Sequence, residues 1–435
     1  WTSGPKAETV YLTEVNAVLP DALREAIGEA IATEGDSVAL YDTLRAWSIL
    51  TGRTEWAPSF LAGWVEVRGE TLGIGGLAEH VAYLDGPEPR LAVPDDELME
   101  QARRFASEAP EVDRAFLELL RLDEMRALGR WVPVDFIAEI EDVFVLRTGK
   151  PLAEGLPHAL ASQGWELASG GAVNDAILIA RVEAAKLFPT PAQTSPQSRK
   201  AVLDKLQSVS IARWKNWLED LRVQPFADGK SARLVSGALS RPNSSLAQII
   251  EGVWREVGGQ DPTRPIENKK QIDATFGPEI SYIRSGKISE LSSLFASLNV
   301  ALSTIDQNEE RGIDALMNLQ ERARSVVALR EAPPLVSQIA EDVLAQTSAV
   351  HAQVLTNPLT REWQARVYPL CQRAIDGVYP FHNGQDVGLA SFEDFFGGRG
   401  ALSRFYGQYA QRNLDTTGEK WRWSTEARLQ GLSPE

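Results

Sequence analysis

The sequence predicts an all-α protein built from several irregular helical bundles, with a little strand near the C-terminus. Apolar residues recur at every third or fourth position over most of the 435 residues, which is typical of amphipathic helices. Runs that alternate apolar and polar residues, as strands do, are almost absent. A chain of this length is also too long for one ordinary hydrophobic core, so we expect two to four packing units.

The apolar stripes indicate core-facing helix surfaces in the first half of the chain. Each stripe has the three-and-four spacing that places its members on one side of a helix. The expected core residues are Leu19, Leu23, Ala26, Ile27, Ala30 and Ile31; Leu40, Tyr41, Leu44, Trp47 and Ile49; and Val112, Ala115, Phe116, Leu119 and Leu120.

Similar stripes continue through the second half. They are Val202, Leu203, Leu206, Val209, Trp214, Trp217, Leu218 and Leu221; Leu246, Ile249, Ile250, Val253 and Trp254; and Ile288, Leu291, Leu294, Phe295, Leu298, Ala301, Leu302 and Ile305. The last is the most regular amphipathic helix of the chain. Tryptophans on these stripes are expected to pack in the core and not to stack on a ligand.

Clusters of Pro, Gly and Ser mark the breaks between helical blocks. The segment 189–198 is the strongest candidate for an interdomain connection, and 258–265 is expected to be an exposed loop. Asp95 or Asp96 should cap the helix that follows residues 87–94. We predict N-terminal helical subdomains over 1–190, a central helical subdomain over 191–373, and a C-terminal helical segment over 374–435.

Composition excludes several classes of partner. The 60 acidic and 44 basic side chains give a net charge of −16, which disfavours binding to nucleic acid or to anionic lipid.

No run of about 18 apolar residues is present, so no membrane span is expected. The chain starts at Trp1 without a leader and is expected to be part of a longer protein. The lone Cys371 excludes an intrachain disulfide and should be a buried small hydrophobic residue.

No pattern indicates a catalytic, cofactor or metal site. The four histidines are scattered singly. The carboxylate clusters are expected to be solvated, and Gly229-Lys230-Ser231 lacks the leading glycine of a phosphate loop, so we interpret it as a turn. The histidines are His80, His158, His351 and His382, and the carboxylate clusters are Asp95 with Asp96, Glu139 with Glu141 and Asp142, and Glu309 with Glu310. The glycine clusters, Gly73, Gly75 and Gly76 and Gly397, Gly398 and Gly400, follow no convincing strand, so they do not indicate a dinucleotide site.

Several sequence blocks, taken in order, resemble one family. They are Leu40–Trp47, Val143–Pro157, Trp214–Phe226, Pro242 with Ser245 and Leu246, Trp363–Cys371, Tyr379-Pro380-Phe381, Asp386–Phe396 and Trp421-Arg422-Trp423. Together they resemble the periplasmic region of the IcmF/TssM family of type VI secretion systems. Thr148 stands where the family has Ser, Ala410 and Asn413 replace usually apolar positions, and the resemblance is weak before about Ser37.

The residues of these blocks are expected to define the fold. Gly149-Lys150-Pro151 and Gly155-Leu156-Pro157 should punctuate a sharply turning loop. In the 386–396 block we expect a helix with Ser391 near its start and Phe392, Phe395 and Phe396 facing inward. Trp421 and Trp423 should lie in an extended segment.

The resemblance implies a non-catalytic, structural segment in the periplasm of a bacterial inner-membrane protein. The partners it implies are an outer-membrane lipoprotein, mainly through a β domain expected beyond this chain, a second inner-membrane subunit of the complex, and copies of the protein itself. Two alternatives stay open. One is a helical hydrolase with dispersed carboxylates and tryptophans, and the other is a cytoplasmic helical adaptor that binds peptides in a groove.

Overall fold

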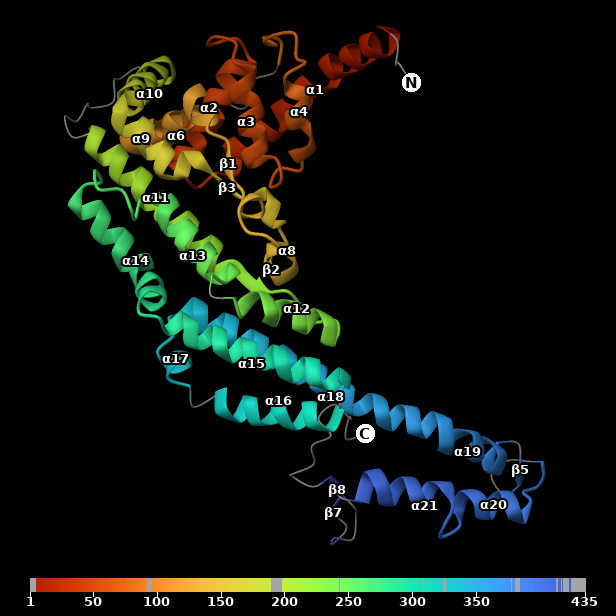
Figure 1. Ribbon diagram of the computed structural model, residues 1–435. Coiled ribbons are helices and arrows are strands. Elements are labelled where there is room, and N and C mark those ends of the chain that lie inside the picture. The colour runs from red at the N-terminus through yellow and green to blue at the C-terminus, as the bar shows by residue number, and fades with distance from the viewer. Residues whose placement is uncertain are drawn as a thin grey trace. The chain divides into compact units, whose positions relative to one another are not determined.

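The chain folds into two compact units, each assembled from separated stretches of sequence. Figure 1 labels the helices and strands. The computed structural model describes residues 5–91, 96–188, 198–241, 243–307, 309–323, 326–376, 378–379, 384–411, 414–415, 417 and 422–423. Unit 1 is Trp1–Val132, Glu154–Asn216 and Val253–Thr275, and unit 2 is Pro133–Ala153, Trp217–Gly252 and Phe276–Glu435. The predicted domain boundaries near residues 190 and 373 stay a prediction.

Helices form most of unit 1. They are α1 (Pro5–Thr33), α2 (Ser37–Leu50), α3 (Pro58–Arg68), α4 (Ala78–Val81), α5 (Asp96–Ser107), α6 (Glu111–Arg121), α7 (Asp123–Arg126), α9 (Ser162–Leu167) and α10 (Val173–Leu187). Three more contribute residues to both units: α11 (Ser198–Asp220), α13 (Ser245–Glu256) and α14 (Ile266–Arg284). Strand β1 (Arg130–Trp131) pairs antiparallel with β3 (Leu156–Pro157).

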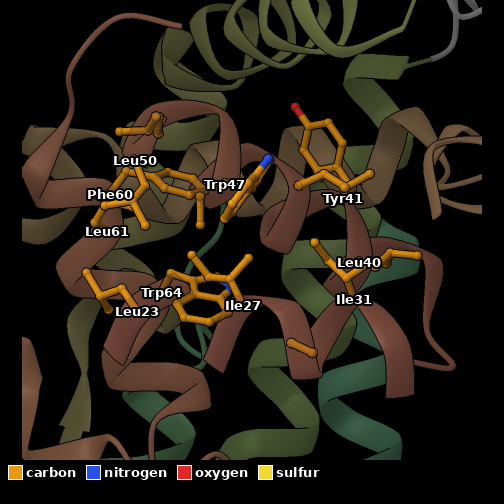
Figure 2. Close-up of a cluster of buried hydrophobic side chains, with 14 of the residues drawn as sticks. Leu23, Ile27, Ile31, Leu40, Tyr41, Trp47, Leu50, Phe60, Leu61 and Trp64 are labelled. Carbon is orange, nitrogen blue, oxygen red and sulfur yellow. The ribbon is translucent and has the colours of Figure 1, made fainter. Parts of the chain in front are cut away.

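The larger core of unit 1 gathers side chains from α1, α2 and α3 (Figure 2). Leu23, Ile27, Trp47 and Leu61 are completely buried there. Asp36 starts α2, because its side chain accepts hydrogen bonds from the backbone N–H groups of Val38 and Ala39. The predicted stripes in α1 and α2 are therefore confirmed as core faces.

A second core in unit 1 lies between α6 and α10, which pack along each other. Ala115, Phe116 and Leu119 of the predicted stripe are buried, whereas Val112 and Leu120 are partly buried at its edge. Trp214 is fully buried, and its indole Nε1 donates to the carbonyl of Leu160 at 2.7 Å. The tryptophan is thus a packing residue, as predicted.

Unit 2 is also helical. Its helices are α8 (Ile140–Val143), α12 (Gly229–Leu239), α15 (Lys287–Gln307), α16 (Glu309–Ala323), α17 (Val327–Arg330), α18 (Pro334–Glu362), α19 (Tyr368–Ile375), α20 (Leu389–Phe396) and α21 (Ala401–Phe405). Its strands are β2 (Phe144–Leu146) with β4 (Leu221–Val223), β5 (Val378–Tyr379) with β6 (Gln385–Asp386), and β7 (Leu414–Asp415) with β8 (Arg422–Trp423). Since every strand in the described ranges has two or three residues, the all-α prediction is confirmed.

Helix α15 is long and apolar enough over Lys287–Ile305 to cross a membrane, and it is the one helix in the described part of the chain that meets this test. Leu291, Phe295 and Leu298 are nonetheless buried within the protein, and α15 packs against α12 and α16. We therefore interpret α15 as a core helix of unit 2, as its amphipathic stripe predicts.

The C-terminal part of unit 2 has a small core around Val367, Ala374, Phe395 and Ala401. Two predictions fail here. Phe392 is 37% exposed, because the short helix α20 turns only Phe395 fully inward. Cys371 is partly and not fully buried, since it lies at the edge of this cluster.

Strand β8 confirms an extended segment at Arg422–Trp423, and Trp421 lies outside the described residues. The segment 189–197, Asp95, Pro242, Pro380 and Phe381 also lie outside them. Asp96 is the first residue of α5 and so does not occupy the capping position that precedes the helix.

Candidate functional site

A buried network of ion pairs joins α2, α6 and α10 in unit 1. Arg45 of α2 contacts Glu118 of α6, and its Nε lies 3.4 Å from the Oε2 of Glu183 on α10. Arg121 of α6 donates from Nη1 to Glu118 at 2.8 Å and from Nη1 and Nη2 to the two carboxylate oxygens of Asp42 at 3.1 and 2.5 Å. Glu118 is only 4% exposed and therefore forms buried ion pairs with two arginines, Arg45 and Arg121.

The ring of Phe60 on α3 lies against both cations of this network. The guanidinium carbons of Arg45 and Arg121 are 4.3 and 4.5 Å from its centroid. Guanidinium groups at this distance are attracted by the electron-rich ring face. Phe60 thus ties α3 to the ion network as well as to the core.

The electrostatics of this cluster favour structure over proton transfer. Burial alone would lower the pKa of Arg121, but the carboxylates of Asp42 and Glu118 outweigh it and raise the pKa above its usual value. Burial also raises the pKa of the Tyr41 hydroxyl well above its usual value. Both groups keep one protonation state around neutral pH, so neither is suited to general acid–base catalysis.

The turn between α13 and α14 contains another buried arginine of unit 1. Arg264 is 6% exposed, its guanidinium carbon lies 4.3 Å from a ring centroid of Trp165, and its Nη1 donates to the Oε1 of Gln207 at 2.8 Å. Gly258 has φ of +90°, and a Cβ there would lie 2.1 Å from the Arg264 Nη2. The prediction that 258–265 is an exposed loop is therefore wrong for Gly258, Gly259 and Arg264, which are buried.

Two of the sequence blocks quoted above meet in unit 2. Strand β2 of the Val143–Pro157 block pairs with β4 of the Trp214–Phe226 block. Beside them, Thr148 Oγ1 donates to the Oδ2 of Asp220 at 2.6 Å, and the Nε of Arg147 lies 3.3 Å from Oδ1. Burial tends to raise the pKa of Asp220, but these hydrogen bonds and the Arg147 charge lower it overall. Gly149 and Gly155 have positive φ, as the predicted sharp turns require.

Residues 2–258 match the family model described as "IcmF-related: Intracellular multiplication and human macrophage-killing". The chain belongs to the IcmF-related family. It is also 25% identical to the "Type VI secretion system component TssM1" of Pseudomonas aeruginosa over 99% of this chain. The chain spans 45% of the length of that relative.

A search of solved structures finds a chain of a "Type VI secretion system membrane core complex". The two share 15% sequence identity and a TM-score of 0.39, over 73% of this chain and 66% of the other.

The described residues of this IcmF-related chain contain no group of three His, Cys, Asp or Glu that could hold a metal ion. His80 and His158 lie apart, the first bonded to the Tyr11 hydroxyl and the second, through Nδ1, to the carbonyl of Leu128. The side chains of His351 and His382 lie outside the described set. Because Glu139, Glu141 and Asp142 are exposed, the prediction of a solvated carboxylate cluster is confirmed.

The Gly229-Lys230-Ser231 segment is the start of a helix and not a turn. Asp228 precedes α12 and accepts from the backbone N–H of Ser231, while Ser231 Oγ accepts from the backbone N–H of Asp228. This reciprocal pair is a capping box, which satisfies N–H groups at a helix start. The turn prediction is wrong because Asp228 and Ser231, three residues apart, form the cap of a helix start.

The buried ion network escaped prediction because its members resemble solvated surface charges. The one feature of the sequence that could have indicated burial is the position of these charged residues relative to the apolar stripes. Arg45, Glu118 and Arg121 each fall within or beside an apolar stripe that the sequence assigns to the core, so their side chains could not all reach solvent. A charge on a core-facing stripe needs a counter-charge there.

Proposed function

We propose that this chain is a structural segment of a type VI secretion membrane-complex component, that it lies in the periplasm, and that it acts by packing with copies of the protein and with other subunits. The observation that carries the proposal is membership of the IcmF-related family. The TssM1 relative, which matches along nearly the whole chain, supports the secretion-system assignment.

The physical character of the chain agrees with a structural role. Ion pairs of Arg45 with Glu118 and Glu183, and of Arg121 with Asp42, join three helices of unit 1, and such pairs favour one relative position of the helices. A net charge of −16 favours solubility in an aqueous compartment. We also propose that the segment has no catalytic activity of its own.

The proposed partners are an outer-membrane lipoprotein, a second inner-membrane subunit and other copies of the same protein. Family resemblance supports all three.

The compartment can be tested by cysteine labelling in intact cells. In a Cys371→Ser background of the full-length protein, Ile266→Cys on α14 and Val300→Cys on α15 place thiols at positions that are 74% and 65% exposed. A maleimide that crosses the outer but not the inner membrane should label both. Leu23→Cys, which replaces a fully buried residue, is the matched control and should stay unlabelled until the protein is denatured. Labelling of the two exposed positions only after inner-membrane lysis would contradict the periplasmic proposal.

A further inference from the structure

A groove in unit 1 runs between α3 and α6 and is occupied by no other part of the described chain. It is a hollow of about 460 Å³, and a smaller one of about 210 Å³ adjoins it. Gly63, Val67, Leu117 and Arg121 line both hollows. We call the two together the α3–α6 groove.

The walls of the groove are apolar and open. Val67 is 79% exposed, and Leu117 and Leu120 on the facing wall are partly exposed. A Cβ added at Gly63 would meet no atom within 4 Å. Glycine in the middle of a helix is less favourable than alanine, so nothing in local helix stability favours it here. Its effect is to keep the groove wide.

The rim of the groove carries uncompensated negative charge. Arg45 and Arg121 on its floor are already paired with carboxylates of the ion network. Glu66 on α3 and Asp123 on α7 lie on opposite sides, both exposed and without an ion pair in the described part of the chain. Arg126 is the one cation on the rim that no described carboxylate pairs with. An occupant should therefore be apolar along its middle and mainly basic along its edges.

We propose that the α3–α6 groove binds an amphipathic helix of another subunit, with an apolar stripe flanked by lysine or arginine. The inference rests on the proposed function for the identity of that subunit as a member of the secretion complex. The α3 wall, from Ala57 to Val67, is about 16 Å long at about 1.5 Å per residue, which matches three turns of a bound helix. Three apolar anchors at positions i, i+4 and i+7 fit this length. A second copy of this chain, with 60 acidic and 44 basic residues, suits an acidic rim less well.

The test is photo-crosslinking in the native host with Val67→p-benzoylphenylalanine in the full-length protein. Mass spectrometry of the product should identify a basic amphipathic helix from a different subunit of the complex. The same probe at Val18, 60% exposed on α1, is the control position and should not give this product.

Two sets of variants make the test specific to the groove. Gly63→Phe fills the groove and should reduce the product about tenfold, while Gly63→Ala should leave it within about twofold. Glu66→Lys combined with Asp123→Lys should reduce it about fivefold, against no loss for the exposed control Glu79→Lys. The charge reversals lie at exposed positions and should leave the fold intact. They therefore test the docking proposal even where Gly63→Phe impairs folding.

The outcomes separate the two proposals. A crosslink to a second copy of this chain, to lipid or to nothing, or a product unchanged by the groove variants, overturns the docking proposal. A groove-dependent crosslink to a basic helix of a cytoplasmic protein supports the groove and overturns the proposed periplasmic function.

Discussion

Arg45 and Arg264 are two buried arginines of unit 1 whose guanidinium groups lie at the same distance, 4.3 Å, from an aromatic ring. Their counter-charges differ. Arg45 has two carboxylates, Glu118 and Glu183, which come from two other helices. Arg264 has the neutral amide of Gln207 and one carboxylate, Asp261, at 3.5 Å and only three residues away in the chain.

An arginine packed on an aromatic ring can therefore either join helices through ion pairs, as Arg45 does, or be held mainly by packing, as Arg264 is. Burial lowers the pKa of Arg264 to about 10, which the charge of Asp261 offsets only in part. Arg264 is therefore a cation held in place by packing on Trp165. The Arg45 cluster, by contrast, is an ionic tie between α2, α6 and α10. Replacing the arginine by methionine should therefore destabilise unit 1 strongly at Arg45 and only weakly at Arg264.

The largest effect is expected for Arg45→Met. It removes a cation and leaves Glu118 and Glu183 partly uncompensated, so unit 1 should lose about 3–5 kcal/mol of unfolding free energy. Urea unfolding followed by tryptophan fluorescence measures this loss. The exposed Arg53→Met is the control and should change stability by less than about 0.5 kcal/mol. Equal small effects at both positions would show that the network is not a structural tie.

Gly258→Ala should have the next largest effect, because it combines positive φ with a steric clash. The new Cβ would occupy the place of the Arg264 Nη2, so Arg264 would leave Trp165. We expect a loss of about 2 kcal/mol, in the range for a strained backbone position. Gly28→Ala, in the interior of α1 with no atom within 4 Å of the new Cβ, is the matched control and should be neutral or stabilising. A neutral Gly258→Ala would mean that Arg264 does not lock this turn.

Arg264→Met should change stability by no more than about 1 kcal/mol in either direction, because an apolar chain of similar length replaces a poorly compensated buried charge. Arg264→Ala should cost more, since it removes the packing on Trp165. The two variants are compared by the same urea titration. If Arg264→Met destabilises unit 1 as strongly as Arg45→Met, the contrast between the two sites is wrong.

The smallest effect concerns pH. Burial tends to raise the pKa of Asp261, but hydrogen bonds from Thr263 and the charge of Arg264 lower it below the usual 3.8. A carboxyl with a lowered folded pKa stabilises the fold above its unfolded pKa and loses that contribution as pH falls through the folded pKa. Asp261→Asn should therefore cost about 1 kcal/mol at pH 7.

The difference between Asp261→Asn and the unchanged protein should shrink as the pH falls below 3.8. Unfolding titrations at several pH values measure it, with the exposed Asp314→Asn as control. A difference that stays constant with pH would contradict the assignment of the effect to the ionised carboxylate.

Periodicity was enough to predict the helices and most of their buried faces. Leu23, Ile27 and Trp47 lie where the stripes place them because helix geometry turns such residues to one side. The sequence could not predict which charges are buried. Arg264 lies among Pro, Gly and Asp residues typical of an exposed loop, and only the three-dimensional fold brings Trp165 and Gln207, which are distant in sequence, beside it.

The groove was equally invisible to sequence reasoning. Gly63 belongs to no recognisable motif and lies within a helical run. The sequence therefore does not distinguish it from any other glycine inside a helix. Its significance depends on the position of α6 across from α3, which local sequence does not determine. Histidines and paired carboxylates, the residue types that often mark a site, are by contrast easy to find in a sequence, and those whose side chains the structure describes are dispersed or exposed to solvent.

The central claim is that this chain is a structural part of a type VI secretion membrane complex. Crosslinking with mass spectrometry on the full-length protein in intact cells tests it most directly, by identifying which proteins contact residues 1–435. We expect links to other copies of the protein, to an outer-membrane lipoprotein and to a second inner-membrane subunit. Links confined to cytoplasmic proteins would contradict it.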